Sequence, residues 1–150
     1  MSVEGIDEVS FGALDLAACQ RFFGDWGLTQ VSASAQTLVY ESLNGCRVIA
    51  AASDTPGLPP GIEPDPTLRE VVWGVQTQAD LDAVREKFKS QPGFVDSGDR
   101  VGCTDPNGLA VRVQVSRKRP VALTAAKTNT WTDRVRVNQP APAYDRATPV

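Results

Sequence analysis

The sequence predicts an α+β fold built from two similar units in tandem. Five residues, Glu8-Val9-Ser10-Phe11-Gly12, recur in kind and order as Glu70-Val71-Val72-Trp73-Gly74, 62 residues later (70 − 8). Each copy is followed by a segment with the apolar spacing of an amphipathic helix, and then by short segments typical of strands. Each unit is therefore expected to form one strand, one helix and three further strands.

The first unit is expected to span about residues 6–54. After a strand over 9–14, Asp15 is placed to cap a helix that Gly24 and Gly27 end. Asn44-Gly45 supplies a hairpin turn between the last two strands. The three strands that follow the helix are expected over 29–33, 37–41 and 47–51.

The second unit is expected to span about residues 69–115, after a loop rich in Pro and Gly over 55–66. Its helix is expected over 78–89, and Asp105-Pro106-Asn107-Gly108 is a turn before its last strand. The strands of this unit are expected over 70–75, 94–96, 100–103 and 109–115. Residues 6–115 thus form one expected domain.

Residues 116–150 are punctuated by proline and carry seven basic residues against two acidic ones. This segment is predicted to be a basic tail or interdomain linker. Because the rest of the chain is acidic and the formal net charge is −3, docking onto the chain's own body or onto a partner is favoured over binding to nucleic acid.

Composition excludes several classes of protein. No apolar stretch approaches the ~18 residues of a membrane span, and residues 1–20 lack a secretory signal, so a cytoplasmic protein is expected. Cys19, Cys46 and Cys103 show no Cys-x-x-Cys spacing, so they predict buried thiols and no disulfide or zinc site. The sequence has no histidine, which excludes serine and cysteine triads and histidine metal sites within this chain.

Glu8 and Glu70 are the candidate functional carboxylates, since each opens the repeated strand of its unit. Aligning the two Asn-Gly turns places Ile49 and Arg112 at equivalent positions of the last strands. Two carboxylates in a partly dry cleft repel, which raises the pKa of one of them or requires a cation. The planar fork of Arg112 could supply that charge and suits bidentate pairing. We therefore expect Arg112 to pair with Glu70 and to reach toward Glu8.

Three aromatic side chains are candidate ligand contacts in the same cleft, together with Arg112. These are Phe11 and Trp73, which are equivalent in the repeat, and Tyr40. The competing interpretation places these aromatics in the core, where strand aromatics commonly lie. For the two carboxylates the alternatives are an ion-paired structural role, general acid or base work, and metal ligation.

Taken together, four motifs resemble the vicinal oxygen chelate superfamily, which includes glyoxalase I, bleomycin-resistance proteins and extradiol dioxygenases. They are the starts Ile6 to Phe11 and Glu70 to Trp73, the helix from Asp15 to Leu28, and the turn Asp105 to Gly108. The resemblance implies two βαβββ units packed into a half-open mixed β-barrel, followed here by an extended C-terminal tail that contains prolines.

The resemblance is greatest to the N-terminal, non-catalytic half of two-domain dioxygenases similar to catechol 2,3-dioxygenase. Residues 135–140 look like the linker to a second half that holds Fe(II) with two His and one Glu. The family's metal positions correspond here to Glu8, Ile49, Glu70 and Arg112, and neither Ile nor Arg ligates a divalent cation. The resemblance therefore implies no metal and no cofactor in this chain.

Three functions follow as hypotheses. The first is an inactive scaffold module that packs on a catalytic dioxygenase half, or on further copies of itself, in the breakdown of aromatic compounds. The second is a metal-free small-molecule binder of the bleomycin-resistance type, with a small aromatic ligand. The third is a metal-independent enzyme that uses Glu8 or Glu70 as a general base.

Overall fold

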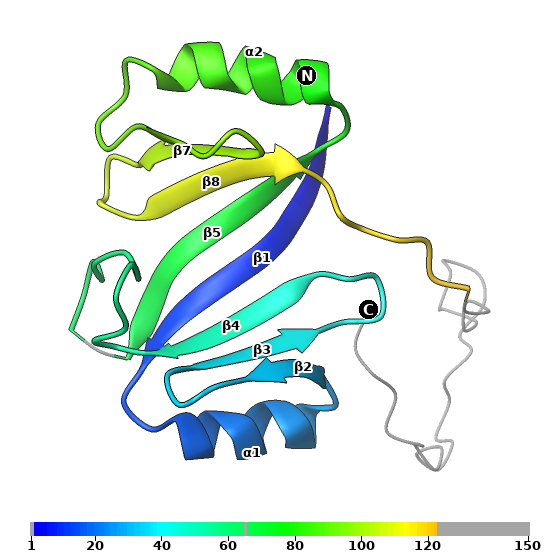
Figure 1. Cartoon of the computed structure of the whole chain (residues 1–150), viewed down its shortest axis with the longest axis vertical. Coiled ribbons are helices and arrows are strands. Elements are labelled where there is room, and N and C mark those ends of the chain that lie inside the picture. The colour runs from blue at the N-terminus through cyan, green and yellow to red at the C-terminus, as the bar shows by residue number, and fades with distance from the viewer. Residues whose placement is uncertain (1, 65, 123–150) are drawn as a thin grey trace, which may run out of the picture.

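The computed structural model describes residues 2–64 and 66–122, which form one eight-stranded mixed sheet with two helices (Figure 1). The first unit holds β1 (Val3–Ala13), α1 (Leu16–Trp26), β2 (Thr29–Ala33), β3 (Thr37–Glu41) and β4 (Arg47–Ala52). The second holds β5 (Thr67–Val75), α2 (Gln78–Phe88), β6 (Val95–Asp96), β7 (Arg100–Thr104) and β8 (Ala110–Val115). The predicted α+β class and the duplicated order of elements are confirmed, and the sheet does not close.

The two units meet through their first strands. The strand order is β2-β3-β4-β1-β5-β8-β7-β6, with β1 antiparallel to β5 at the centre. Each first strand pairs in parallel with the last strand of its own unit, β1 with β4 and β5 with β8. The arrangement is a pseudo-twofold repeat, in which the blue β1 and green β5 cross the middle of the molecule side by side (Figure 1).

Local sequence accounts for the helix ends. The carboxylate of Asp15 accepts a hydrogen bond from the backbone N–H of Ala18, as expected for an N-cap, and Thr77 caps α2 in the same way. Of the two glycines expected to end α1, Gly27 does so, and the helix continues through Gly24 to Trp26. Gly27 ends it with φ of 96°, a left-handed conformation that glycine adopts without strain.

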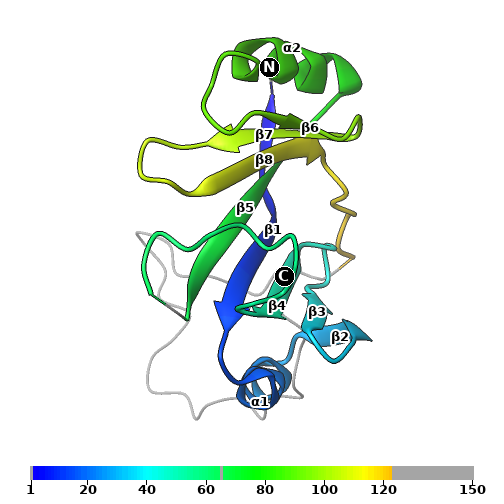
Figure 2. The same cartoon turned by 60° about the vertical axis from the view of Figure 1, so that its left-hand side comes forward.

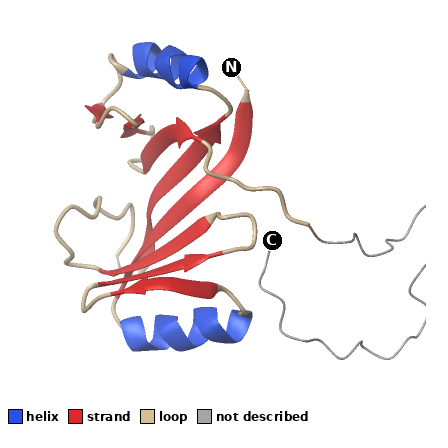
Figure 3. Ribbon diagram, turned by 45° about the vertical axis from the view of Figure 1, so that its right-hand side comes forward, coloured by secondary structure: helices blue, strands red, loops and turns tan. Residues whose placement is uncertain are grey.

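Both helices pack on one face of the sheet, which we call the helix-covered face, and they lie over its opposite ends (Figures 2 and 3). Under α1, the buried side chains are Leu28, Leu38, Tyr40 and Ala50. Under α2, they are Val75, Leu81, Val84, Val101 and Val113. The two cores are separate, so each unit stabilises its own helix.

No helix among the described residues is long and apolar enough to cross a membrane.

Candidate functional site

The face of the sheet opposite the helices carries most of the charged strand residues, and we call it the charged face. Strand register places them there: Glu8 lies opposite Val72 of β5 and beside Arg47 of β4, and Glu70 lies opposite Ser10. Because residues opposite each other share a face, Glu8 and Glu70 point to the same side from the two central strands. The sheet thus brings together the two carboxylates that the repeat singled out.

Arginines from the second unit neutralise both carboxylates. Arg112 Nε lies 3.1 Å from Glu70 Oε2, so the expected pair is present. The expectation that Arg112 also reaches Glu8 is wrong. Arg100 takes that place, because its Nη1 lies 3.1 Å from Glu8 Oε1 and 3.9 Å from Glu70 Oε1. Arg100 and Arg112 therefore both balance the negative charge of the two carboxylates, whose side chains are 13% exposed or less.

Sequence reasoning missed Arg100, although the hairpin register contains the signal. The turn after Thr104 pairs that residue with Ala110, which places Gly102 opposite Arg112 and Arg100 opposite Gln114. Every second residue along β7 and β8 therefore faces the two carboxylates. Gly102 is required beside Arg112, because a Cβ at this position would clash with the arginine Cδ and Nη1.

The environment of Glu70 disfavours its ionised form. Burial raises the pKa of this carboxyl above its ordinary value, and the charge of Glu8 raises it further. Arg112 and Arg100 act in the opposite direction and offset only part of the effect of burial on the pKa. Removal of either arginine should therefore raise the Glu70 pKa further.

Asp7, beside Glu8, anchors the chain that leaves β8. Its side chain is 3% exposed and accepts hydrogen bonds from Gln114 Nε2, Ser116 Oγ and the backbone N–H of Arg117, at 3.0, 2.9 and 3.0 Å. Gly74 permits this approach, since a Cβ there would lie 2.5 Å from Asp7 Oδ1. The role of Asp7 could not be predicted from the sequence, because its hydrogen-bond partners lie more than 100 residues away in the chain.

Residues 116–119, which we call the strap, cross from the second unit to the first. Arg119 donates from its backbone N–H to Asn44 O at 2.9 Å and from Nε to Leu43 O at 3.1 Å. Its Nη2 also lies 3.2 Å from Glu41 Oε2. For residues 116–119, the expected docking of the basic segment onto the body is confirmed, and residues 123–150 lie outside the described part of the chain.

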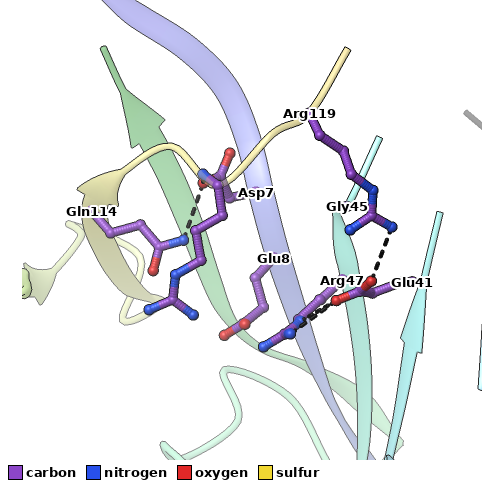
Figure 4. A pocket seen from close by; sticks show the side chains of 8 residues that line it. Asp7, Glu8, Glu41, Gly45, Arg47, Gln114 and Arg119 are labelled. Atoms are coloured by element: carbon purple, nitrogen blue, oxygen red, sulfur yellow. Dashed lines mark hydrogen bonds and ion pairs between the residues drawn. The ribbon is translucent and has the colours of Figure 1, made fainter. Parts of the chain in front are cut away.

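The strap and the charged face enclose a cavity of about 120 Å³ (Figure 4). On the side of the cavity formed by the first unit, Arg47 Nη2 lies 2.9 Å from Glu41 Oε1. Glu41 is therefore ion-paired with both Arg47 and Arg119. The hydrogen bond from Arg47 is the main reason why the pKa of Glu41 lies below its ordinary value. Asp7, Glu8 and Gln114 line the opposite side.

The four positions that the resemblance equates with metal ligands do not fit a metal ion. Glu8 and Glu70 supply carboxylate oxygens, but both are engaged by arginine, and Arg112 itself occupies one of the four positions. Ile49, opposite Ser10 on the same face, supplies no donor atom. Within residues 2–64 and 66–122, no group of three or more His, Cys, Asp or Glu could hold a metal.

The three aromatic candidates lie on the helix-covered face, away from Glu8, Glu70 and Arg112. Tyr40 is 1% exposed, and its ring centroid lies 5.2 Å from that of Phe23 on α1. Phe11 and Trp73 line separate apolar hollows beside α1 and α2. Side chains alternate along a strand, so the position after Ser10 and the one after Val72 point away from the charged face. Their role as ligand contacts stays a prediction.

Solved structures with the vicinal oxygen chelate fold are similar to this chain. The Mn(II)-bound glyoxalase from Novosphingobium aromaticivorans shares 21% sequence identity over 81% of this chain, with a TM-score of 0.57. An extradiol ring-cleaving dioxygenase from B. fuscum shares 16% identity over 79% of the chain, with a TM-score of 0.58. The chain therefore has the vicinal oxygen chelate fold.

A catechol 2,3-dioxygenase structure is similar at a TM-score of 0.60 and 16% identity, over 77% of this chain. The chain spans 43%, 34% and 42% of the glyoxalase, the B. fuscum enzyme and the catechol dioxygenase, so it matches less than half of each. Neither a protein-family model nor a curated protein sequence matches the chain.

Proposed function

We propose that this chain is a non-catalytic vicinal oxygen chelate module that acts as a scaffold for the catalytic half of an extradiol ring-cleaving dioxygenase. The observation that carries the proposal is the ion-pair network of Glu8, Glu70, Arg100 and Arg112. These internal arginines supply the positive charge that carboxylates on this face require. The face is thereby stable without a divalent cation.

The size of the cavity beside Glu8 supports the same proposal. Pockets for small ligands usually enclose ~300–1,000 Å³. The cavity between the strap and the charged face is about 120 Å³, which is room for a few water molecules. This cavity is too small for an aromatic substrate, so it favours the scaffold over a binder or a general-base enzyme that works in the space beside Glu8.

The likeness to dioxygenases supports the choice of partner. Two of the similar structures are ring-cleaving dioxygenases, and this chain matches about a third to two fifths of their length. The proposed partner is a polypeptide half with the same fold that carries two His and one Glu as iron ligands. It would be part of the same polypeptide or encoded beside it.

The proposal is tested by catechol cleavage. This chain alone, supplied with Fe(II) without oxygen and then exposed to air, should form no ring-opened product. The catalytic half should cleave catechol, and its activity or thermal stability should fall when this chain is left out. Turnover by this chain alone that disappears in Glu70→Gln would overturn the proposal and favour the enzyme hypothesis. A catalytic half unaffected by this chain would overturn the scaffold role.

A further inference from the structure

The helix of the first unit leaves exposed the apolar positions that the second unit buries. The two helices have the same length and are related by the 62-residue repeat, so Phe22 corresponds to Val84 and Trp26 to Phe88. Val84 is 5% exposed and Phe88 is half-buried, whereas Phe22 is 62% and Trp26 is 60% exposed. The fold can therefore bury side chains at these two helix positions, as it does in the second unit, but in the first unit both side chains are exposed.

A groove runs between α1 and the central strand β1 on the helix-covered face. It encloses about 560 Å³, and Phe11, Phe22 and Trp26 are among its lining residues. A smaller hollow of about 190 Å³ shares Val9, Trp26 and Val48 with it, so the two form one continuous depression along β1. Among the described residues that line the larger part, none carries a charge.

The exposed rings supply about half of the area that a standard interface buries on each partner. Trp73 extends the patch across β5, because it lies opposite Ile6, which lines the smaller hollow. Phe11 is 36% and Trp73 37% exposed. With ~150–250 Å² per aromatic side chain, these two rings, Phe22 and Trp26 leave roughly 300–500 Å² of apolar surface exposed. That area is about half of the ~800 Å² that each partner buries in a standard protein interface.

We propose that this surface is a homodimer interface, in which α1 packs antiparallel against α1 of a second copy across a twofold axis. Arg21 and Asp25 are exposed, carry opposite charges and lie one turn apart beside the rings. In an antiparallel pair that crosses near Phe23, Arg21 of each copy faces Asp25 of the other. The same patch therefore complements itself, with an aromatic centre and a charged rim.

A second copy fits this surface better than a small ligand does. Phe22 and Trp26 present more than half of their area to solvent, and a molecule inside the groove would leave their outward sides uncovered. The groove also offers few polar groups to orient a ligand, whereas small-molecule sites usually contain several. An apolar patch with a charged rim is typical of contacts between proteins.

Sedimentation velocity of the full chain over a range of concentrations tests the interface. The chain should be a dimer at micromolar concentrations, and Phe22→Lys or Trp26→Lys should raise the dissociation constant at least tenfold. Val95→Lys is the matched control, because Val95 is 42% exposed and lies on β6 of the other unit, and it should dimerise as before. Circular dichroism confirms that each variant is folded.

Charge reversal tests the orientation of the two helices. Arg21→Asp and Asp25→Arg should each weaken the dimer, because each places like charges opposite one another, and the double variant should restore it. A monomer at all concentrations would overturn the proposal, as would a dimer that Phe22→Lys leaves intact or a double variant without recovery. These outcomes leave the proposed function untouched, since none of these residues lies on the charged face.

Discussion

The ion pair between Arg112 and Glu70 gives the sharpest prediction for stability. Arg112→Met keeps the aliphatic stem over Gly102 and removes the guanidinium that lies 3.1 Å from Glu70. Glu70 then retains only Arg100, at 3.9 Å and shared with Glu8. In the variant, the negative charge of Glu70 has little access to water and only a distant arginine to balance it.

The magnitude follows from how far the pair is buried. Breaking a fully buried pair costs ~3–5 kcal/mol, whereas an exposed pair is worth ~0–1 kcal/mol. The side chains of Arg112 and Glu70 are 19% and 13% exposed, and Arg100 compensates part of the charge. We therefore expect Arg112→Met to lower the free energy of unfolding by about 2–3 kcal/mol near pH 8.

The loss should depend on pH. Arg112 lowers the Glu70 pKa, so its removal raises that pKa further, and a protonated Glu70 requires no cation. Arg112→Met should therefore cost less at pH 5 than at pH 8. Urea unfolding followed by tryptophan fluorescence at both values measures this difference.

Two variants serve as controls for this measurement. Arg47→Met should cost less than ~1 kcal/mol, because Arg47 is 38% exposed and Glu41 keeps Arg119 at 3.2 Å. Glu70→Met combined with Arg112→Met removes both charges and should recover most of the loss. A cost below ~0.5 kcal/mol for Arg112→Met at pH 8, or an equal cost at both pH values, would refute the reasoning.

Three further predictions concern the same face. Gly102→Ala should lower the free energy of unfolding by ~1–3 kcal/mol, because the new Cβ meets both the Arg112 side chain and the backbone oxygen of Val111. The effect should shrink but not vanish in Arg112→Ala, since the contact with Val111 O remains, and urea titration of the double variant measures it. Asp7→Ala should release the strap, so hydrogen exchange at the Arg117 and Arg119 amides should accelerate, and equal exchange would contradict the anchoring role. Because the folded-state pKa of Glu70 is raised, the folded chain binds that proton more tightly, and Glu70's contribution to stability falls as pH rises above 4.5. Glu70→Gln should remove that slope, and an unchanged pH profile would contradict it.

Much of the fold follows from local sequence. The repeat, the helix cap at Asp15 and the turn residues were sufficient to place both helices and all the strands in the right order. The strand ends were less predictable, because β1 begins at Val3 through its pairing with β5, a contact between units. Gly24 shows the same limit, since local sequence does not distinguish a glycine inside the last turn of a helix from the glycine that ends it.

The candidate site could be predicted only where it rests on the repeat. Glu8, Glu70 and the Arg112 contact follow from equivalent positions, whereas Arg100 and Asp7 depend on hairpin register and on contacts with the strap. The aromatic residues were harder to place than the charges. Alternation along a strand puts the side chains of neighbouring residues on opposite faces of the sheet. The sequence alone does not say which face binds a ligand, because either face of a central strand can hold an aromatic side chain.

Metal titration is the most direct test of the central claim, that arginines take the place of a metal ion on the charged face. Isothermal titration of the full chain with Mn(II), with Fe(II) in the absence of oxygen as a second arm, should show no stoichiometric binding at micromolar concentrations. Thermal unfolding should be equally unaffected by the two ions. Stoichiometric binding that is lost in both Glu8→Gln and Glu70→Gln would contradict the account.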